Sequence, residues 1–179
     1  MKMAVNNFSS CPVITTRLLT LRQLTSDDAQ KIFALRSDPE INKYLERTPA
    51  RVFDDAIRFI NMVNDNIKNC NSLYWAVTLS DSNSFAGTIC LFDFSVENRS
   101  CEIGYELLVN FQGRGIMQEA VEAVINFAFN RLQIRQLVAV VHHQNAGSNK
   151  LLERFHFLPS QHTENEQSDY KAFTLVRPI

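Results

Sequence analysis

Two glycines flank an arginine in the stretch NFQGRGIMQEA, residues 110–120, where a strand-like run gives way to a helix-like run. The first turn of a helix leaves about four backbone N–H groups unpaired, and the helix dipole adds roughly half a positive charge there. Gly113 and Gly115 keep side chains away from these amides and accept positive φ angles, and Arg114 adds a charged donor. The pattern predicts a phosphate-binding loop. The alternative is a loop that needs glycine only for its turn.

Two common nucleotide motifs do not fit this stretch. A P-loop requires G-x-x-x-x-G-K-[ST], but the residues after Gly115 contain no lysine or hydroxyl at the required place. A dinucleotide-binding turn requires a small residue where Gln118 stands. It also requires an acidic residue about 20 positions on, where Gln133 and its immediate neighbours are uncharged. The stretch therefore favours neither ATP nor NAD.

The elements around this loop alternate between strand and helix patterns. Helices are predicted to begin near residues 25, 38, 50, 116 and 145. Short polar turns join three of the predicted strands, which indicates an antiparallel meander. The strands are predicted at 13–24, 73–79, 85–94, 101–109 and 134–142, with a closing pair near 157–164 and 170–176. We expect one α/β (α+β) domain over residues 1–179, with a mixed, mostly antiparallel sheet of about six to seven strands flanked by helices.

The composition excludes several classes of protein. The 179 residues carry 18 basic and 19 acidic side chains without a basic stripe, so we expect no nucleic-acid partner. No run approaches the roughly 18 to 20 apolar residues of a membrane span, and the N-terminus turns polar too soon for a signal peptide. We therefore expect a cytoplasmic protein without a membrane partner. A monomer and a homodimer both remain open.

No metal site is expected. The four cysteines lie scattered, without a C-x-x-C pair or a run of histidines at metal-ligand spacing, which favours reduced structural thiols over zinc ligands. His142 and His143 are adjacent in a predicted strand, where neighbouring side chains point to opposite faces, so we expect them not to serve one site. The cysteines are Cys11, Cys70, Cys90 and Cys101.

Four stretches together resemble the GCN5-related N-acetyltransferase (GNAT) superfamily. QGRGIMQEA (112–120) resembles its Q/R-x-x-G-x-G/A pyrophosphate loop, and EIGY (102–105) resembles the fourth strand of the ribosomal-protein alanine acetyltransferase (RimJ/RimL-like) branch. TRLLTLR (16–22) is offset by one residue from that branch's T-x-R-L-x-L-R start, and NAGSNKLLERFHF (145–157) resembles its N-x-x-S-x-x-L-L-E-K-L-G-F helix. The resemblance spans nearly the whole chain.

This resemblance implies an acetyl-CoA site where the sheet splays between the strand ending at Val109 and the strand ending near His142. It implies that acetyl-CoA is the co-substrate and that its pantetheine arm lies in the gap. The residues implied to bind it are Leu107, Leu108 and Val109 for the arm, the amides of Gly113, Arg114, Gly115, Ile116, Met117 and Gln118 for the pyrophosphate, and the side chain of Asn145.

Three residues depart from the family pattern. Met117 stands where the loop prefers glycine or alanine. His156 replaces the glycine that usually ends the last helix, and in a left-handed conformation it should cost about 1 kcal/mol. Leu152 stands where many relatives place a tyrosine that protonates the CoA thiolate, so that acid is missing.

Acetyl transfer to an amine requires a neutral amine, a polarised carbonyl and a protonated leaving thiolate. A peptide α-amine, with a pKa of about 7.7 to 8.0, is easier to deprotonate than lysine, with about 10.4, by roughly 3 kcal/mol. A modest general base therefore suffices for an N-terminus. Glu102 is the candidate, because it lies in the strand leading into the loop and matches a strand glutamate of some family members. The alternative is an exposed carboxylate that shares a polar face with Glu106.

Ser148, which matches a serine of the ribosomal-protein branch, is the remaining candidate acid for the thiolate. The alternative is that Ser148 caps a helix beside Asn145. A backbone N–H near Leu108 could polarise the carbonyl. We therefore expect an N-acetyltransferase that acts on a primary amine, such as a protein N-terminus, by direct attack in a ternary complex. A small-molecule amine as acceptor, or a CoA-binding module without turnover, remain the alternatives.

Overall fold

A single sheet forms the centre of the computed structural model, which describes residues 8, 10–160 and 168–178. Its order is β1-β2-β3-β4-β5-β6-β8-β7, and each neighbouring pair is antiparallel except β5 and β6. The expected fold class is confirmed. The sheet has eight strands rather than the expected six to seven, because it includes two strands of only two residues each. The strands are β1 (Ile14–Thr15), β2 (Leu19–Gln23), β3 (Ser72–Leu79), β4 (Phe85–Ser95), β5 (Ser100–Leu107), β6 (Gln136–His142), β7 (Leu158–Pro159) and β8 (Tyr170–Val176).

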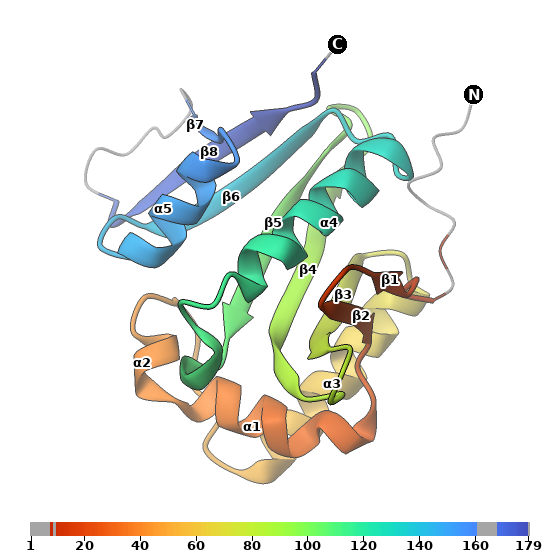
Figure 1. Ribbon diagram of the computed structural model, residues 1–179, viewed down its shortest axis with the longest axis vertical. Coiled ribbons are helices and arrows are strands. Elements are labelled where there is room, and N and C mark those ends of the chain that lie inside the picture. Colours follow the sequence, from red (N-terminus) through yellow and green to blue (C-terminus); the bar gives the residue numbers. More distant parts are fainter. Residues whose placement is uncertain (1–7, 9, 161–167, 179) are drawn as a thin grey trace.

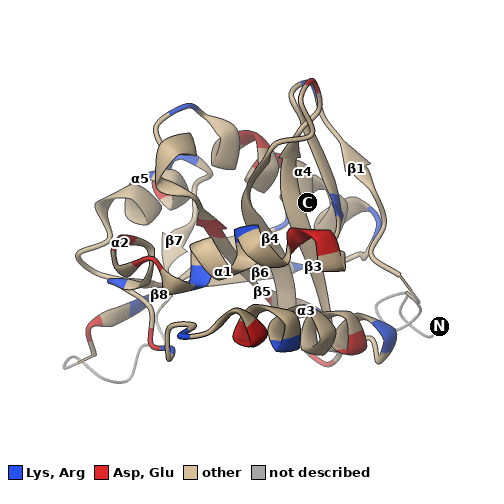
Figure 2. Ribbon diagram, turned by 90° about the horizontal axis from the view of Figure 1, so that it is seen from below, with Lys and Arg blue, Asp and Glu red and all other residues tan. Residues whose placement is uncertain are grey.

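Helices cover both faces of the sheet (Figure 1). Figure 2 shows α3 and α4 on opposite sides of it. On the α3 side, Phe59 meets Tyr74 of β3 with ring centroids 5.5 Å apart. On the α4 side, Phe127 meets the fully buried Trp75 at 5.8 Å, so alternate residues of β3 anchor the two layers. The helices are α1 (Ala29–Ser37), α2 (Pro39–Asn42), α3 (Phe53–Lys68), α4 (Ile116–Asn130) and α5 (Ala146–Arg154).

The boundaries differ from the sequence predictions at three places. The strand predicted at 13–24 is broken by a tight turn, in which the Thr16 amide donates to the Leu19 carbonyl at 2.9 Å. β5 ends at Leu107, and Val109–Phe111 form a short 3-10 turn. Only residues 158–159 of the predicted strand 157–164 are β7, and residues 161–164 lie outside the described residues. His156 has φ of 60°, as expected for a residue that replaces a terminating glycine.

β5 and β6 are paired over only three residues each. Their parallel ladder joins Ser100, Cys101 and Glu102 to Gln136, Leu137 and Val138, and it stops there. In Figure 1 the two strands meet near the top and separate downwards, while β6 stays paired with β8 as far as His142. The sheet therefore opens beyond Glu102, which confirms the expected splay.

Charged residues of both signs alternate over the helices drawn in Figure 2, with acidic and basic side chains interspersed along α3. Among the residues that the structure describes, no helix is both long enough and apolar enough to cross a membrane.

Candidate functional site

The glycine loop presents bare backbone at the start of α4. Gly113 and Gly115 have φ of 73° and 77°, and Gly115 is the N-cap residue, with no side chain capping the helix. A Cβ atom placed on either glycine would meet no atom within 4 Å. Glycine therefore suits both positions, because the backbone is left-handed there. It also leaves an open space in front of the amides of Ile116, Met117 and Gln118.

Neighbouring side chains hold this loop in place without covering the amides. The Gln112 side chain donates to the Leu107 carbonyl at 3.1 Å, which ties the loop to the end of β5. The Met117 side chain is 8% exposed and packs in the core, so it points away from the open space. Arg114 lies over the Phe111 ring at 5.8 Å and is exposed, as a residue that approaches a ligand from solvent would be.

Glu119, in the first turn of α4, fixes the position of this helix against the N-terminal turn. Its carboxylate accepts hydrogen bonds from the Thr16 hydroxyl at 2.6 Å and the Leu18 amide at 2.7 Å. These two hydrogen bonds hold the negatively charged carboxylate of the first turn in place. This role of Glu119 was not predicted from the sequence, where the TRLLTLR stretch that supplies its partners is the available signal.

Replacing Glu119 by alanine should destabilise the fold by about 2 kcal/mol, because hydrogen bonds to charged groups contribute about 1.5–3 kcal/mol. In a chain of this size the melting temperature should fall by roughly 4–8 °C, which thermal unfolding followed by circular dichroism measures. Glu122→Ala, an exposed position one turn along α4, is the control and should change the free energy of unfolding by less than about 0.5 kcal/mol. Equal losses in both variants would contradict the role given to Glu119.

Glu102 is the last residue of β5 that pairs with β6, at the start of the opening. It is half-buried, and no hydrogen bond to its carboxylate is found among the described residues. Burial, and next the negative charge of Asp93, raise the pKa of Glu102 above its usual value. A carboxylate with a raised pKa in an opening is the arrangement expected of a general base.

Glu106, on the same face of β5, is neutralised by Arg47. Two nitrogens of Arg47 donate to its two carboxylate oxygens at 2.7 and 2.5 Å, and Asn42 accepts a further bond from Arg47 Nε at 2.7 Å. The Arg47 and Glu106 side chains are only 18% and 13% exposed. Arg36 lies close enough to interact electrostatically with both. Glu102 and Glu106 are therefore not equivalent, although the sequence placed them on one face.

The three backbone residues expected to bind the pantetheine arm lie at the end of β5. The Leu108 amide donates to the Ala86 carbonyl at 2.9 Å, so it is not available to polarise a thioester carbonyl. Backbone N–H groups of successive strand residues point to opposite edges, and the Leu107 amide therefore points toward the edge where β6 no longer pairs. Val109 belongs to the 3-10 turn after the strand. The amide donor in the opening is that of Leu107 rather than of Leu108.

Asn145 and Ser148 lie at the start of α5. Asn145 is the N-cap residue, and its side-chain oxygen accepts the Ser148 amide at 3.1 Å. The capping role considered for Ser148 therefore belongs to Asn145, and the Ser148 hydroxyl is left for other contacts. Leu152, one turn further, is fully buried in the core, so its position is used for packing.

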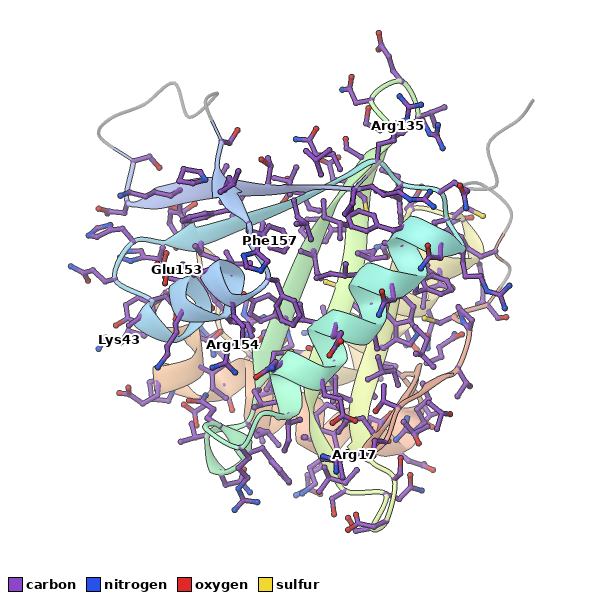
Figure 3. All side chains as sticks on the ribbon, turned by 45° about the horizontal axis from the view of Figure 1, so that its top comes forward. Arg17, Lys43, Arg135, Glu153, Arg154 and Phe157 are labelled. Carbon is purple, nitrogen blue, oxygen red and sulfur yellow. The ribbon has the colours of Figure 1, made fainter. Side chains whose placement is uncertain are left out.

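A contact between side chains joins α4 and α5 over the opening. Arg154 of α5 extends toward the first turn of α4 (Figure 3), where it donates a hydrogen bond to the side-chain oxygen of Gln118. This places a guanidinium group beside the amides exposed by the glycine loop. No local pattern in the sequence indicates this role of Arg154, because 36 positions separate it from Gln118.

The prediction that His142 and His143 lie apart is wrong. Their rings stack with centroids 4.8 Å apart, because β6 ends at His142 and the strand alternation ends with it. With Asp169 they bring ligand atoms within 4.8 Å of one another. Each Nδ1 atom already has a partner, the Gln144 amide at 3.1 Å for His142 and the Asp169 carbonyl at 3.0 Å for His143. These contacts fix the two rings at the end of β6.

Aromatic residues lie at the open end of the gap between β5 and β6. The His142 ring lies 5.1 Å from that of Tyr44 and 5.2 Å from that of Tyr170. The Tyr170 hydroxyl donates to the Tyr44 carbonyl at 3.0 Å, which links the segment after α2 to β8 across 126 positions. The segment after α2 therefore contacts the ends of β6 and β8 at the open end of the gap.

Comparison with known proteins gives a consistent family. The acetyltransferase (GNAT) domain family matches residues 18–158. The uncharacterized N-acetyltransferase YoaA of Bacillus subtilis (strain 168) is 30% identical over 173 residues, which cover 93% of this chain and 98% of that protein.

Solved structures share the fold at lower identity. RimJ of Mycobacterium smegmatis, in complex with CoA-disulfide, has a TM-score of 0.80 at 16% identity and covers 92% of this chain and 87% of its own. Spermidine N-acetyltransferase of Vibrio cholerae, in complex with CoA and spermine, has a TM-score of 0.76 at 21% identity and covers 88% and 95%. The family match confirms the resemblance to the GNAT superfamily, and RimJ shares its fold with this chain.

Proposed function

The chain belongs to the GNAT acetyltransferase domain family, and we propose that it moves an acetyl group from acetyl-CoA to a primary amine by direct attack in a ternary complex. The observation that supports this best is the separation of β5 from β6 directly after Glu102. It leaves a half-buried carboxylate, the bare amides at the start of α4 and the start of α5 around one opening. A direct attack requires no covalent nucleophile.

Acetyl-CoA is proposed to bind along the α4 and α5 side. The amides of Ile116, Met117 and Gln118 would receive the pyrophosphate, as helix N-termini receive anions, and Arg114 and Arg154 would add charge-assisted hydrogen bonds. The backbone from Leu107 to Val109 and the Asn145 side chain would receive the pantetheine arm. The oxygen of Asn145 already caps α5, so its amide nitrogen would make that contact.

The chemistry is divided between the two faces. Glu102 would take a proton from the amine, directly or through water, as the amine attacks the thioester carbonyl. The Leu107 amide would donate to the carbonyl oxygen as negative charge develops there. Ser148, at the start of α5, would supply a proton on the side of the leaving thiolate.

A peptide N-terminus fits the acceptor side better than a polyamine. A polyamine is a multiple cation and favours several free carboxylates, whereas Glu106 is neutralised by Arg47 and faces Arg36 as well. Arg36 also lines, with Arg51, Arg58 and Asp55, an open surface pocket of about 600 Å³ between α1 and α3. Three arginines against one carboxylate disfavour polycations there, and an N-terminal amine needs only the modest base that Glu102 offers.

Thiol release from acetyl-CoA, measured with a thiol-reactive dye against an amine panel, tests this function. The panel contains peptides with free N-termini, the same peptides blocked at the N-terminus but carrying lysine, spermine, an amino sugar and free amino acids. Release with free N-termini alone supports the proposal, and release with a small amine alone supports the alternative acceptor. CoA binding in calorimetry without release on any acceptor would indicate a non-catalytic CoA-binding module.

A further inference from the structure

The hydroxyl of Tyr105 is buried and has no hydrogen-bond partner among the described residues. In that part of the chain, only one other buried side-chain atom, Nε of Arg99, is in this state. Buried polar atoms are nearly always hydrogen-bonded, because an unpaired one lowers the stability of the fold. An unpaired buried hydroxyl on a face of the sheet therefore requires an explanation.

Tyr105 lies beside the opening, on the face of the sheet that α4 covers. It follows Glu102 by three positions on β5, beyond the last residue paired with β6. Across the strands it pairs with Ile89, which pairs with Trp75, and Trp75 packs on Phe127 of α4. Cross-strand partners point to the same face, whereas Glu102 and Tyr105 are an odd number of positions apart and point to opposite faces.

Ser148 is the side chain that approaches this hydroxyl. Burial raises the pKa of Tyr105 to about 12, and the Ser148 side chain opposes the effect of burial. The Ser148 side chain is close enough to interact with the Tyr105 hydroxyl, although the two do not meet the geometry of a hydrogen bond. Because Asn145 binds the Ser148 amide, α5 begins with Ser148 held in this position.

We propose that Tyr105 is the acid that protonates the departing CoA thiolate, with Ser148 returning a proton to Tyr105 afterwards. This role rests on the proposed acetyl transfer. When the carbon–sulfur bond breaks, its electron pair goes to sulfur, and the Tyr105 proton moves to sulfur to form the thiol. The Tyr105 phenolate then takes the Ser148 proton while Ser148 takes one from solvent. The proton that the amine gave to Glu102 returns to solvent, so the enzyme ends as it began.

Burial raises the pKa of Tyr105 to about 12. Tyr105 remains protonated at neutral pH and can donate. It would do so from β5, because Leu152 occupies the usual position with a buried apolar side chain.

Replacing Tyr105 by phenylalanine tests this role. We expect kcat to fall at least about 10²-fold, the lower end of the range for loss of a general acid, while the Kd for CoA stays within about twofold. The melting temperature should not fall, and should rise by about 2–4 °C, because an unpaired buried hydroxyl has been removed. Opposite changes in rate and stability separate a catalytic role from a structural one. Tyr74→Phe, which loses a hydroxyl bonded to Thr88 on the other face, is the control and should retain its kcat.

A double-mutant cycle with Ser148→Ala completes the test. If the two hydroxyls form one relay, the double variant should be no slower than the slower single variant. An unchanged kcat in Tyr105→Phe, a loss accompanied by a lower melting temperature, or losses that multiply in the double variant would each overturn the role. The failure of the wild-type chain to release thiol with any amine would instead count against the proposed function itself.

Discussion

Replacing Gly115 by glutamate is expected to lower the affinity for CoA by about 10² to 10³-fold. The residue caps α4 at φ of 77°, and a side chain there would enter the open space in front of the helix amides. A carboxylate about 4 Å from a phosphate charge costs roughly 4 kcal/mol at an effective dielectric constant of 20, which corresponds to nearly three orders of magnitude in Kd. Isothermal titration calorimetry with CoA measures this effect.

Two further variants at Gly115 separate charge from backbone strain. Gly115→Gln has the same size as glutamate without the charge, and Gly115→Ala carries only the cost of a left-handed alanine, about 1 kcal/mol. We expect the affinity for CoA to decrease from glycine to alanine to glutamine to glutamate. Equal weakening by glutamine and glutamate would show that no phosphate lies near this position, and full affinity in the glutamate variant would remove the loop from the CoA site.

Replacing Glu102 by glutamine should reduce kcat by about 10² to 10³-fold, within the usual range for loss of a general base, with little change in the Kd for CoA. The stability of the fold should not decrease at pH 7. The folded-state pKa of Glu102 lies above its unfolded value, so its contribution to stability is present at low pH and is lost as pH rises through the folded-state pKa. Glutamine removes that loss. Steady-state thiol release and thermal unfolding measure the two effects.

The pH dependence gives a second test of Glu102. A general base acts in its deprotonated form, so a raised pKa places the acid limb of the kcat profile above the pH expected for an ordinary glutamate, about 4.3. Asp93→Asn removes the nearby like charge and should move this limb to lower pH. Asparagine tolerates the left-handed backbone of Asp93, with φ of 51°. An acid limb that stays in place in Asp93→Asn, or that persists unaltered in Glu102→Gln, would exclude Glu102 as the base.

The elements themselves were predictable because their signals are local. The helical period after Gly115 and the two glycines predicted a helix that begins at Ile116, where α4 begins. The short polar turns predicted the antiparallel meander of β3, β4 and β5, which the register of those strands confirms. Periodicity and turn residues act over a few positions, so they can be read without knowledge of the fold.

The contacts within the site were not predictable because their partners are distant in the sequence. The turn that breaks the first predicted strand binds Glu119, 103 positions after Thr16. Arg47 and Glu106 are 59 positions apart, and nothing near either residue indicates the other. The histidine prediction was wrong because it assumed a strand that continues past His142. Such pairs depend on how the layers pack, which no local pattern contains.

The separation of β5 from β6 also bears on the order in which substrates enter and leave. Glu102 and Tyr105 point to opposite faces of one strand, so in the proposed reaction the amine and the thioester approach from opposite sides. Neither substrate then lies across the route of the other. The two substrates then need no fixed order of binding, and CoA can leave while the acetylated product is still bound. The opening beyond the three residue pairs of β5 and β6 would thus admit the two substrates in either order in the proposed reaction.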